Sequence, residues 1–116
     1  MTLEEVQKYC KQLKGVTEDI KWEDHLCFCV GQKMFLITAP DDTPVSASFK
    51  ASDEDFEELT ARPGFKPAPY MARNKWIFIE DIQLMTPAEW KHYIDKSYEL
   101  IKGKLPKKIL KEQGLL

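Results

Sequence analysis

Several features that mark common classes of protein are missing from this 116-residue sequence. No run of apolar residues approaches the ~20 that a membrane-spanning helix needs. There are only two histidines and three cysteines, and no two cysteines form a C-x-x-C pair. The sequence also has no Gly-rich phosphate loop, no H-E-x-x-H zinc motif and no nucleophile elbow. These absences argue against a membrane protein, a disulfide-rich secreted protein and the enzymes that those motifs identify.

The remaining composition is that of one soluble globular domain over residues 1–116. The first residues, Met1–Glu5, lack the basic and then apolar order of a secretory signal. A low, odd number of cysteines is typical of proteins in a reducing compartment. We therefore expect a cytoplasmic protein without a membrane partner.

The net charge is −2, but the two halves of the chain differ in sign. Residues 1–60 have 13 acidic and 6 basic side chains, whereas residues 61–116 have 6 acidic and 11 basic ones. Between Arg62 and Ile79 there are four basic residues and no acidic one, in a proline-rich segment. This distribution indicates a basic surface on the second half of the chain.

Three helices are predicted where a capping residue precedes apolar residues at helical spacing. The predicted helices cover residues 3–13, a short segment from Ser52 to Arg62, and residues 86–103. The first and third open with a Thr-x-x-Glu capping box. The tail 102–111 that follows contains five lysines and no acidic residue.

Strands are predicted between these helices. They cover residues 26–30, 34–39, 45–50 and 76–80, and residues 16–22 form either a short strand or an extended arm. Gly31 and Gln32 are typical of a tight hairpin turn. In 45–50 apolar and polar residues alternate, which indicates one buried and one wet face. The order predicts an α+β domain of two layers, with about five antiparallel strands and the helices on one face.

The few reactive side chains could belong to a metal site or to a catalytic site. His25, Cys27 and Cys29 share one face of a predicted strand, but ligands at i and i+2 lie ~7 Å apart and a fourth ligand is missing. A nucleophilic thiol would need a nearby base. His92 lies on a predicted helix beside its apolar stripe, at the surface or at the boundary of the core, so it is a poor candidate for that base. We therefore predict no metal, no cofactor and no catalytic residue, and we expect the cysteines to be buried.

The basic side chains admit two interpretations. They are Arg62, Lys66, Arg73 and Lys75, with the lysines at 102, 104, 107, 108 and 111. One interpretation is a solvated face and a basic helix end that suits the helix dipole. The other is contact with nucleic-acid phosphates, with Tyr70, Asn74 or Trp76 near the bases.

Six short segments together resemble one known family. They are L-E-E-V-Q-K-Y-C at 3–10, L-K-G-V-T-E-D at 13–19, F-C-V-G-Q-K-M-F at 28–35, P-A-P-Y-M-A-R-N-K-W at 67–76, Y-I-D-K-S-Y-E-L-I at 93–101 and K-L-P-K-K at 104–108. In order and spacing they resemble the MmcQ/YjbR family of small bacterial proteins. The resemblance implies a twisted antiparallel sheet in a sandwich similar to secretion chaperones and frataxin, and DNA binding through a double-wing arrangement of loops.

The central motif of that family usually reads His-Met-Asn-Lys-x-x-Trp. Met71 and Trp76 match it, and Arg73 keeps the positive charge. Tyr70 and Ala72 replace the histidine and the asparagine, so two hydrogen-bonding side chains of the usual motif are absent here. Lys33 matches a further lysine that is usual in the family.

From these observations we predict a non-enzymatic domain whose partner is DNA. The residues predicted to contact it are Arg73, Lys75, Lys66 and Lys33. The alternative is a module that binds a protein or a small ligand on an incompletely covered sheet face. Its motivation is the run Met34–Ile37, which is apolar on both faces of a strand although helices are expected to cover only one. Such a face could also bind a second copy, so both a monomer and a weak homodimer are compatible with the sequence.

Overall fold

A computed structural model of the protein describes residues 1–69 and 71–115. The α-helices are α1 (Leu3–Lys11), α2 (Asp53–Thr60), α3 (Pro87–Lys102) and α4 (Lys107–Glu112). The strands are β1 (Val16–Lys21), β2 (His25–Val30), β3 (Lys33–Ala39), β4 (Ser46–Lys50), β5 (Phe65–Pro67) and β6 (Trp76–Ile79). Two 3₁₀ turns, η1 (Ala72–Asn74) and η2 (Ile82–Leu84), flank β6. Among the described residues, no helix is both long and apolar enough to cross a membrane.

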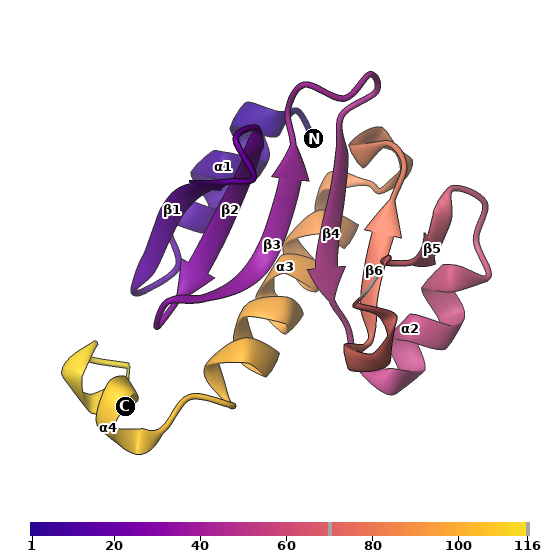
Figure 1. Ribbon diagram of the computed structural model, residues 1–116. Helices are drawn as coiled ribbons and strands as arrows, with labels where there is room; N and C mark the ends of the chain where they lie inside the picture. Colours follow the sequence, from indigo (N-terminus) through magenta and orange to yellow (C-terminus); the bar gives the residue numbers. More distant parts are fainter. Residues whose placement is uncertain (70, 116) are drawn as a thin grey trace.

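The strands form one antiparallel sheet with the order β1-β2-β3-β4-β6-β5. Helices α1 and α3 lie on the same face of this sheet, behind it in Figure 1. A hydrogen bond of 2.8 Å from the Tyr9 hydroxyl to Asp95 Oδ1 links these two helices. The predicted α+β class, the antiparallel sheet and the helices on one face are therefore confirmed.

The first and third helices begin as predicted. In both, the threonine side chain accepts from the backbone of the glutamate three residues later, and that glutamate accepts from the threonine backbone. Within segment 16–22, residues 16–21 form a strand, β1, and Trp22 belongs to the turn that follows it. Gly31 and Gln32 form the tight turn between β2 and β3 with positive φ angles of 56° and 67°. Both angles are those of the turn that matches the twist of a hairpin.

Two elements were not predicted. The proline-rich segment contributes β5, in which Phe65 pairs with Ile79 and Pro67 with Ile77. Proline is tolerated there because β5 is the outermost strand, so its missing N–H removes no bond to a further strand. The lysine-rich tail contributes α4, which packs Ile109 towards the Gly31 turn.

A bulge in β3 changes which side chains reach each face of the sheet. Phe28 pairs with Leu36 and Cys29 with Met34, so Phe35 is an extra residue. The Phe35 ring packs edge-on against Tyr98 of α3, with ring centroids 5.6 Å apart. Met34 and Ile37 then both line the opposite face, although residues three apart in a regular strand would point to different faces.

The prediction that one face of β4 is exposed to solvent is wrong. Ser46 and Lys50 are only 3% and 7% exposed, and Ser48 alone on that side is partly open. The Ser46 hydroxyl donates to Asp42 Oδ2 at 2.8 Å, and the Lys50 ammonium donates to the Asn74 carbonyl. Polar residues of β4 are buried because the neighbouring loops supply these partners, which the strand alone could not reveal.

Candidate functional site

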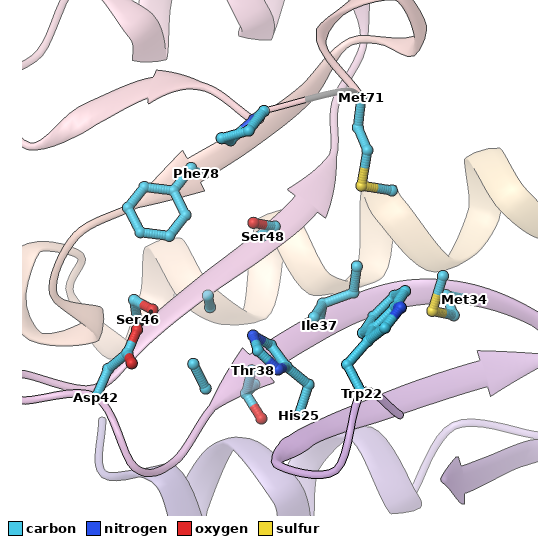
Figure 2. A pocket seen from close by; sticks show the side chains of 13 residues that line it. Trp22, His25, Met34, Ile37, Thr38, Asp42, Ser46, Ser48, Met71 and Phe78 are labelled. Atoms are coloured by element: carbon cyan, nitrogen blue, oxygen red, sulfur yellow. Dashed lines mark hydrogen bonds between the residues drawn. The ribbon is translucent and has the colours of Figure 1, made fainter. Parts of the chain in front are cut away.

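The sheet face opposite α1 and α3 contains a groove of about 600 Å³ (Figure 2). Strands β3, β4 and β6 supply its floor, and the β1–β2, β3–β4 and β5–β6 connections supply its rim. The lining residues that Figure 2 labels are Trp22, His25, Met34, Ile37, Thr38, Asp42, Ser46, Ser48, Met71 and Phe78. A volume of this size is typical of sites for small organic ligands.

The two sides of the groove are largely apolar. Ile37 and Ser48 lie between Phe78 and Met71 on one side and Trp22 on the other (Figure 2). The run Met34–Ile37, which motivated the alternative prediction, therefore contributes to both faces of the sheet through its bulge. The groove is the incompletely covered face that the alternative prediction requires.

Trp22 has an unusual backbone and an unusual exposure. Its φ is +52°, in the left-handed region, and its side chain is 61% exposed. Glu23 also has a positive φ, of 69°, so both residues belong to the turn that connects β1 and β2, as Gly31 and Gln32 do in the next hairpin. The turn accounts for the backbone of Trp22 at a cost of about 1 kcal/mol for a bulky residue, whereas a large apolar side chain that is so exposed marks a contact surface. Trp22 is therefore the residue that most strongly suggests a function for the groove.

His25 lies beside Trp22 and contributes a polar group. Its Nδ1 lies 2.7 Å from Asp24 Oδ1, and its ring meets the Trp22 indole edge-on with centroids 5.8 Å apart. A carboxylate only accepts hydrogen bonds, so Nδ1 is the donor to Asp24, and in that tautomer of the neutral ring Nε2 is an acceptor. The sequence had suggested His25 only as a metal ligand, whereas the structure places it as a wall of the groove.

Acidic residues gather at the end of the sheet where Asp42 lies. This end is formed by the β1–β2 and β3–β4 connections and the end of β6. The acidic residues there are Glu23, Asp24, Asp41, Asp42, Glu80 and Asp81. Among the described residues that line the groove, Asp42 alone has a carboxylate. The charged group that the lining itself contributes is therefore a negative one.

Three of the four residues predicted to contact DNA lie towards the opposite end of the sheet. Lys33 begins β3, Arg73 lies in η1, and Lys75 directly precedes β6. These two strands begin at the same end because β4, which lies between them, runs antiparallel to both. Lys66 is separate, since it lies on β5 with its ammonium 5.2 Å from the centre of the Phe78 ring.

Several other basic side chains have structural partners. Arg62 stacks on the Phe65 ring and pairs with Glu89 at 2.7 Å. The hydrogen bond from Arg62 lowers the pKa of the Glu89 carboxyl. Lys102 pairs with Glu99 at 3.2 Å. Lys75 lies over the Phe56 ring of α2, 5.0 Å from its centre. These contacts favour the solvated, structural interpretation for Arg62 and Lys102.

Sequence reasoning missed Lys50 and gave Lys104 no special role. Lys50 is almost fully buried, and its pKa is lowered first by burial and then by the neighbouring Lys104 ammonium. Both lysines lie at the same end of the sheet as Lys33, Arg73 and Lys75. We call these five residues the basic end. The alternation within residues 45–50 had suggested an ordinary solvent-facing lysine, so it contained no signal for the burial of Lys50.

The model of the YjbR family matches residues 11–100 of the chain. The chain belongs to the YjbR family. A crystal structure of a Deinococcus radiodurans protein with the DUF419 domain is similar to it, with a TM-score of 0.87 and 25% identity over 99% of this chain and 89% of that one. A Pseudomonas syringae protein has a similar fold, with a TM-score of 0.72 and 20% identity over 87% of this chain and 99% of that one. No protein with a curated description matches the sequence.

The motif residues that matched the YjbR resemblance serve the core and the groove of this YjbR domain. Trp76 is 5% exposed and packs in the core. Met71 lines the groove, and Arg73 is exposed at the basic end. Tyr70, which replaces the usual histidine, lies outside the described residues. In this YjbR domain the signature segment therefore joins the groove to the basic end.

The cysteines of the YjbR domain are buried, as predicted. Burial raises the pKa of Cys10 to about 12 and that of Cys27 to about 11, and it also raises the pKa of Cys29. These thiols are therefore protonated at neutral pH and are poor nucleophiles. Residues 1–69 and 71–115 contain no group of three or more His, Cys, Asp or Glu side chains placed to hold a metal ion.

Proposed function

We propose that this YjbR domain is a non-enzymatic binding protein whose groove binds a small organic amine. The observation that carries the proposal is Trp22, an exposed indole that borders an apolar groove. A ligand that stacks on this indole would gain an aromatic contact. The high thiol pKa values support a binding role rather than nucleophilic catalysis.

The polarity of the groove supports an amine rather than an acid. The Asp42 carboxylate and the His25 Nε2 acceptor can take hydrogen bonds from an ammonium group. Phe78, Ile37 and Trp22 can contact an apolar body, and the Trp22 indole face also attracts cations. The other acidic residues at the end of the sheet where Asp42 lies add a negative electrostatic potential, which also attracts an ammonium group.

Replacement of Trp22 by glycine is expected to separate binding from stability. In Trp22→Gly the affinity for phenethylamine should fall about tenfold, because an aromatic contact is lost. The free energy of unfolding should stay the same or rise, because glycine adopts a positive φ without strain. Amide chemical-shift titration by NMR measures the affinity, and urea denaturation measures the stability.

The matched control is Ile20→Ala, which removes an apolar side chain that is 59% exposed but does not line the groove. Phenylpropionate provides a second control, because it has the same ring but a carboxylate that Asp42 repels. In Asp42→Asn the preference for the amine should disappear. Equal binding of the amine and the acid to the wild-type chain would contradict the proposal.

The basic end favours a second candidate function, which is contact with the phosphates of nucleic acid. We propose this role for Lys33, Arg73 and Lys75, since the fold brings them to one end of the sheet from separate parts of the sequence. Lys66 was predicted with them, but it contacts Phe78 at the outer edge of the sheet and contributes less to this cluster.

Duplex DNA binding, if it occurs at this end, should depend steeply on salt. The logarithm of the affinity should fall with the logarithm of salt concentration by about 0.9 for each phosphate contacted. The double variant Arg73→Glu with Lys75→Glu should lose binding, whereas Lys8→Glu with Lys91→Glu on the helical face should keep most of it. Fluorescence anisotropy of a labelled duplex, starting at low salt, measures the binding of the two double variants and of the wild-type chain. Absent or salt-independent binding would exclude this second function.

A further inference from the structure

The two outermost strands of the sheet, β1 and β5, differ in how well they are protected from pairing with another chain (Figure 1). Strand β5 has three residues and includes Pro67, which has no backbone N–H to donate. Strand β1 has six residues and no proline, and its register with β2 runs without a shift from Val16 to Lys21. Natural sheets commonly protect an edge by a short strand, a proline or a bulge. Strand β1 is therefore the open edge of this sheet.

The side chains of β1 are exposed although the strand pairs with β2 along its whole length. Residues 17–20 are all exposed. Ile20 is 59% exposed, and Trp22, in the turn that follows, is 61% exposed. These are two of the three large apolar side chains exposed in the described part of the chain, and the third, Leu84, lies in η2. Much of the large apolar surface that the fold leaves uncovered therefore lies at this edge, which marks it as a contact surface.

The charges of β1 decide how a second copy of the strand could pair with it. Two identical antiparallel strands related by a twofold axis set side chains of the same face opposite each other, so one residue faces its own copy. If that residue is Glu18, Asp19 or Lys21, like charges lie directly opposite, which is destabilising. Pairing centred on Thr17 brings no opposite charges of the strand together. Pairing centred on Ile20 is the favourable arrangement that remains.

The arrangement centred on Ile20 is complementary in both shape and charge. The two exposed Ile20 side chains contact each other, and Asp19 of each copy faces Lys21 of the other. Within one chain the Lys21 ammonium already lies 3.3 Å from the Asp19 carboxylate, so the four charges alternate in sign. Glu18 adds no repulsion, because its carboxylate pairs with Lys11 of α1 at 2.6 Å. The strand is therefore complementary to itself in this register.

We propose that β1 pairs with β1 of a second copy of this chain, antiparallel and with Ile20 opposite Ile20, to form a symmetric dimer. One sheet then continues across both copies, main-chain hydrogen bonds supply affinity, and the side-chain pairs fix the register. The twofold axis uses both β1 edges, so assembly stops at two copies. A strand-to-strand contact is small, and the dimer is accordingly weak. The proposal does not rest on the groove, since neither Asp19, Ile20 nor Lys21 lines it.

Sedimentation equilibrium of the full chain, from micromolar to millimolar concentration, tests the dimer, and charge reversal tests its register. Asp19→Lys and Lys21→Glu each set like charges opposite each other in a dimer of identical chains. Each should weaken self-association about tenfold or more. An equimolar mixture of the two variants should restore association, because opposite charges then face each other at both positions. Restored association also shows that both variants fold.

The matched controls reverse the same charges at the other edge of the sheet. They are Glu57→Lys on α2 and Lys66→Glu on β5, which are both exposed positions. Both should associate as the wild-type chain does. The proposal is overturned by a wild-type chain that stays monomeric at millimolar concentration, or by Asp19→Lys and Lys21→Glu chains that associate as well as the wild type. A mixture of these two variants that associates no better than either alone would also overturn it.

Discussion

Trp90→Ala should destabilise the domain by about 3–5 kcal/mol, because it removes a large aromatic side chain from the core. Trp90 is fully buried, and it joins three parts of the fold. It lies on α3, its ring meets Phe49 of β4 with centroids 5.8 Å apart, and its Nε1 donates to the Ile82 carbonyl of η2 at 2.7 Å. Alanine would leave a cavity between the helix and the sheet and an unpaired carbonyl.

Urea denaturation followed by circular dichroism measures this loss. A domain of this size has a total stability of about 5–15 kcal/mol, so the variant should be at the edge of folding at 37 °C. Trp90→Phe is the matched variant, because it keeps most of the volume and leaves only the Ile82 carbonyl unpaired, at a cost of about 1–3 kcal/mol. A loss below about 2 kcal/mol for Trp90→Ala would mean that the surrounding residues collapse into the cavity.

Ser97→Ala is expected to destabilise the domain by about 2–4 kcal/mol, although it removes a single oxygen atom. The Ser97 hydroxyl is fully buried, donates to the Phe35 carbonyl and accepts from the Lys50 backbone N–H. One side chain of α3 thus satisfies a backbone group on each of two neighbouring strands. Phe35 is the residue of the β3 bulge, so its carbonyl lies in a disrupted part of the ladder.

The matched control for this substitution is Ser48→Ala, in the same strand as Lys50 and only partly buried at the groove. Its cost should stay within about 0.5 kcal/mol, as for most surface substitutions. The difference between the two variants in urea denaturation isolates the contribution of the two buried hydrogen bonds. Equal losses for both would show that Ser97 contributes through packing alone.

The predictions that succeeded rest on short-range rules. The capping boxes at Thr2 and Thr86 and the turn at Gly31 are local chemistry, so they could be read directly from neighbouring residues. The antiparallel order followed from short connections between strands. The family resemblance was confirmed independently over residues 11–100.

The predictions that failed depended on partners distant in sequence. Strand β5 exists because Phe65 and Pro67 find an open edge of β6, which no local pattern in a proline-rich segment reveals. Lys50 is buried because Asn74 and Ser97 reach it from other elements. The sequence predicted an incompletely covered sheet face, but it could not predict which side chains line the groove there, because this depends on the β3 bulge at Phe35.

Periodicity, capping and composition act over a few residues. They therefore suffice to predict the class of fold, the starts of the main helices, the burial of the cysteines and the opposite charges of the two halves. Which residues meet depends on the packing of elements that are distant in sequence. The antiparallel register collects acidic connections at one end of the strands and lysines at the other, and it sets Trp22 beside the groove (Figure 2). A binding site requires side chains from separate elements to converge, and convergence is a property of packing.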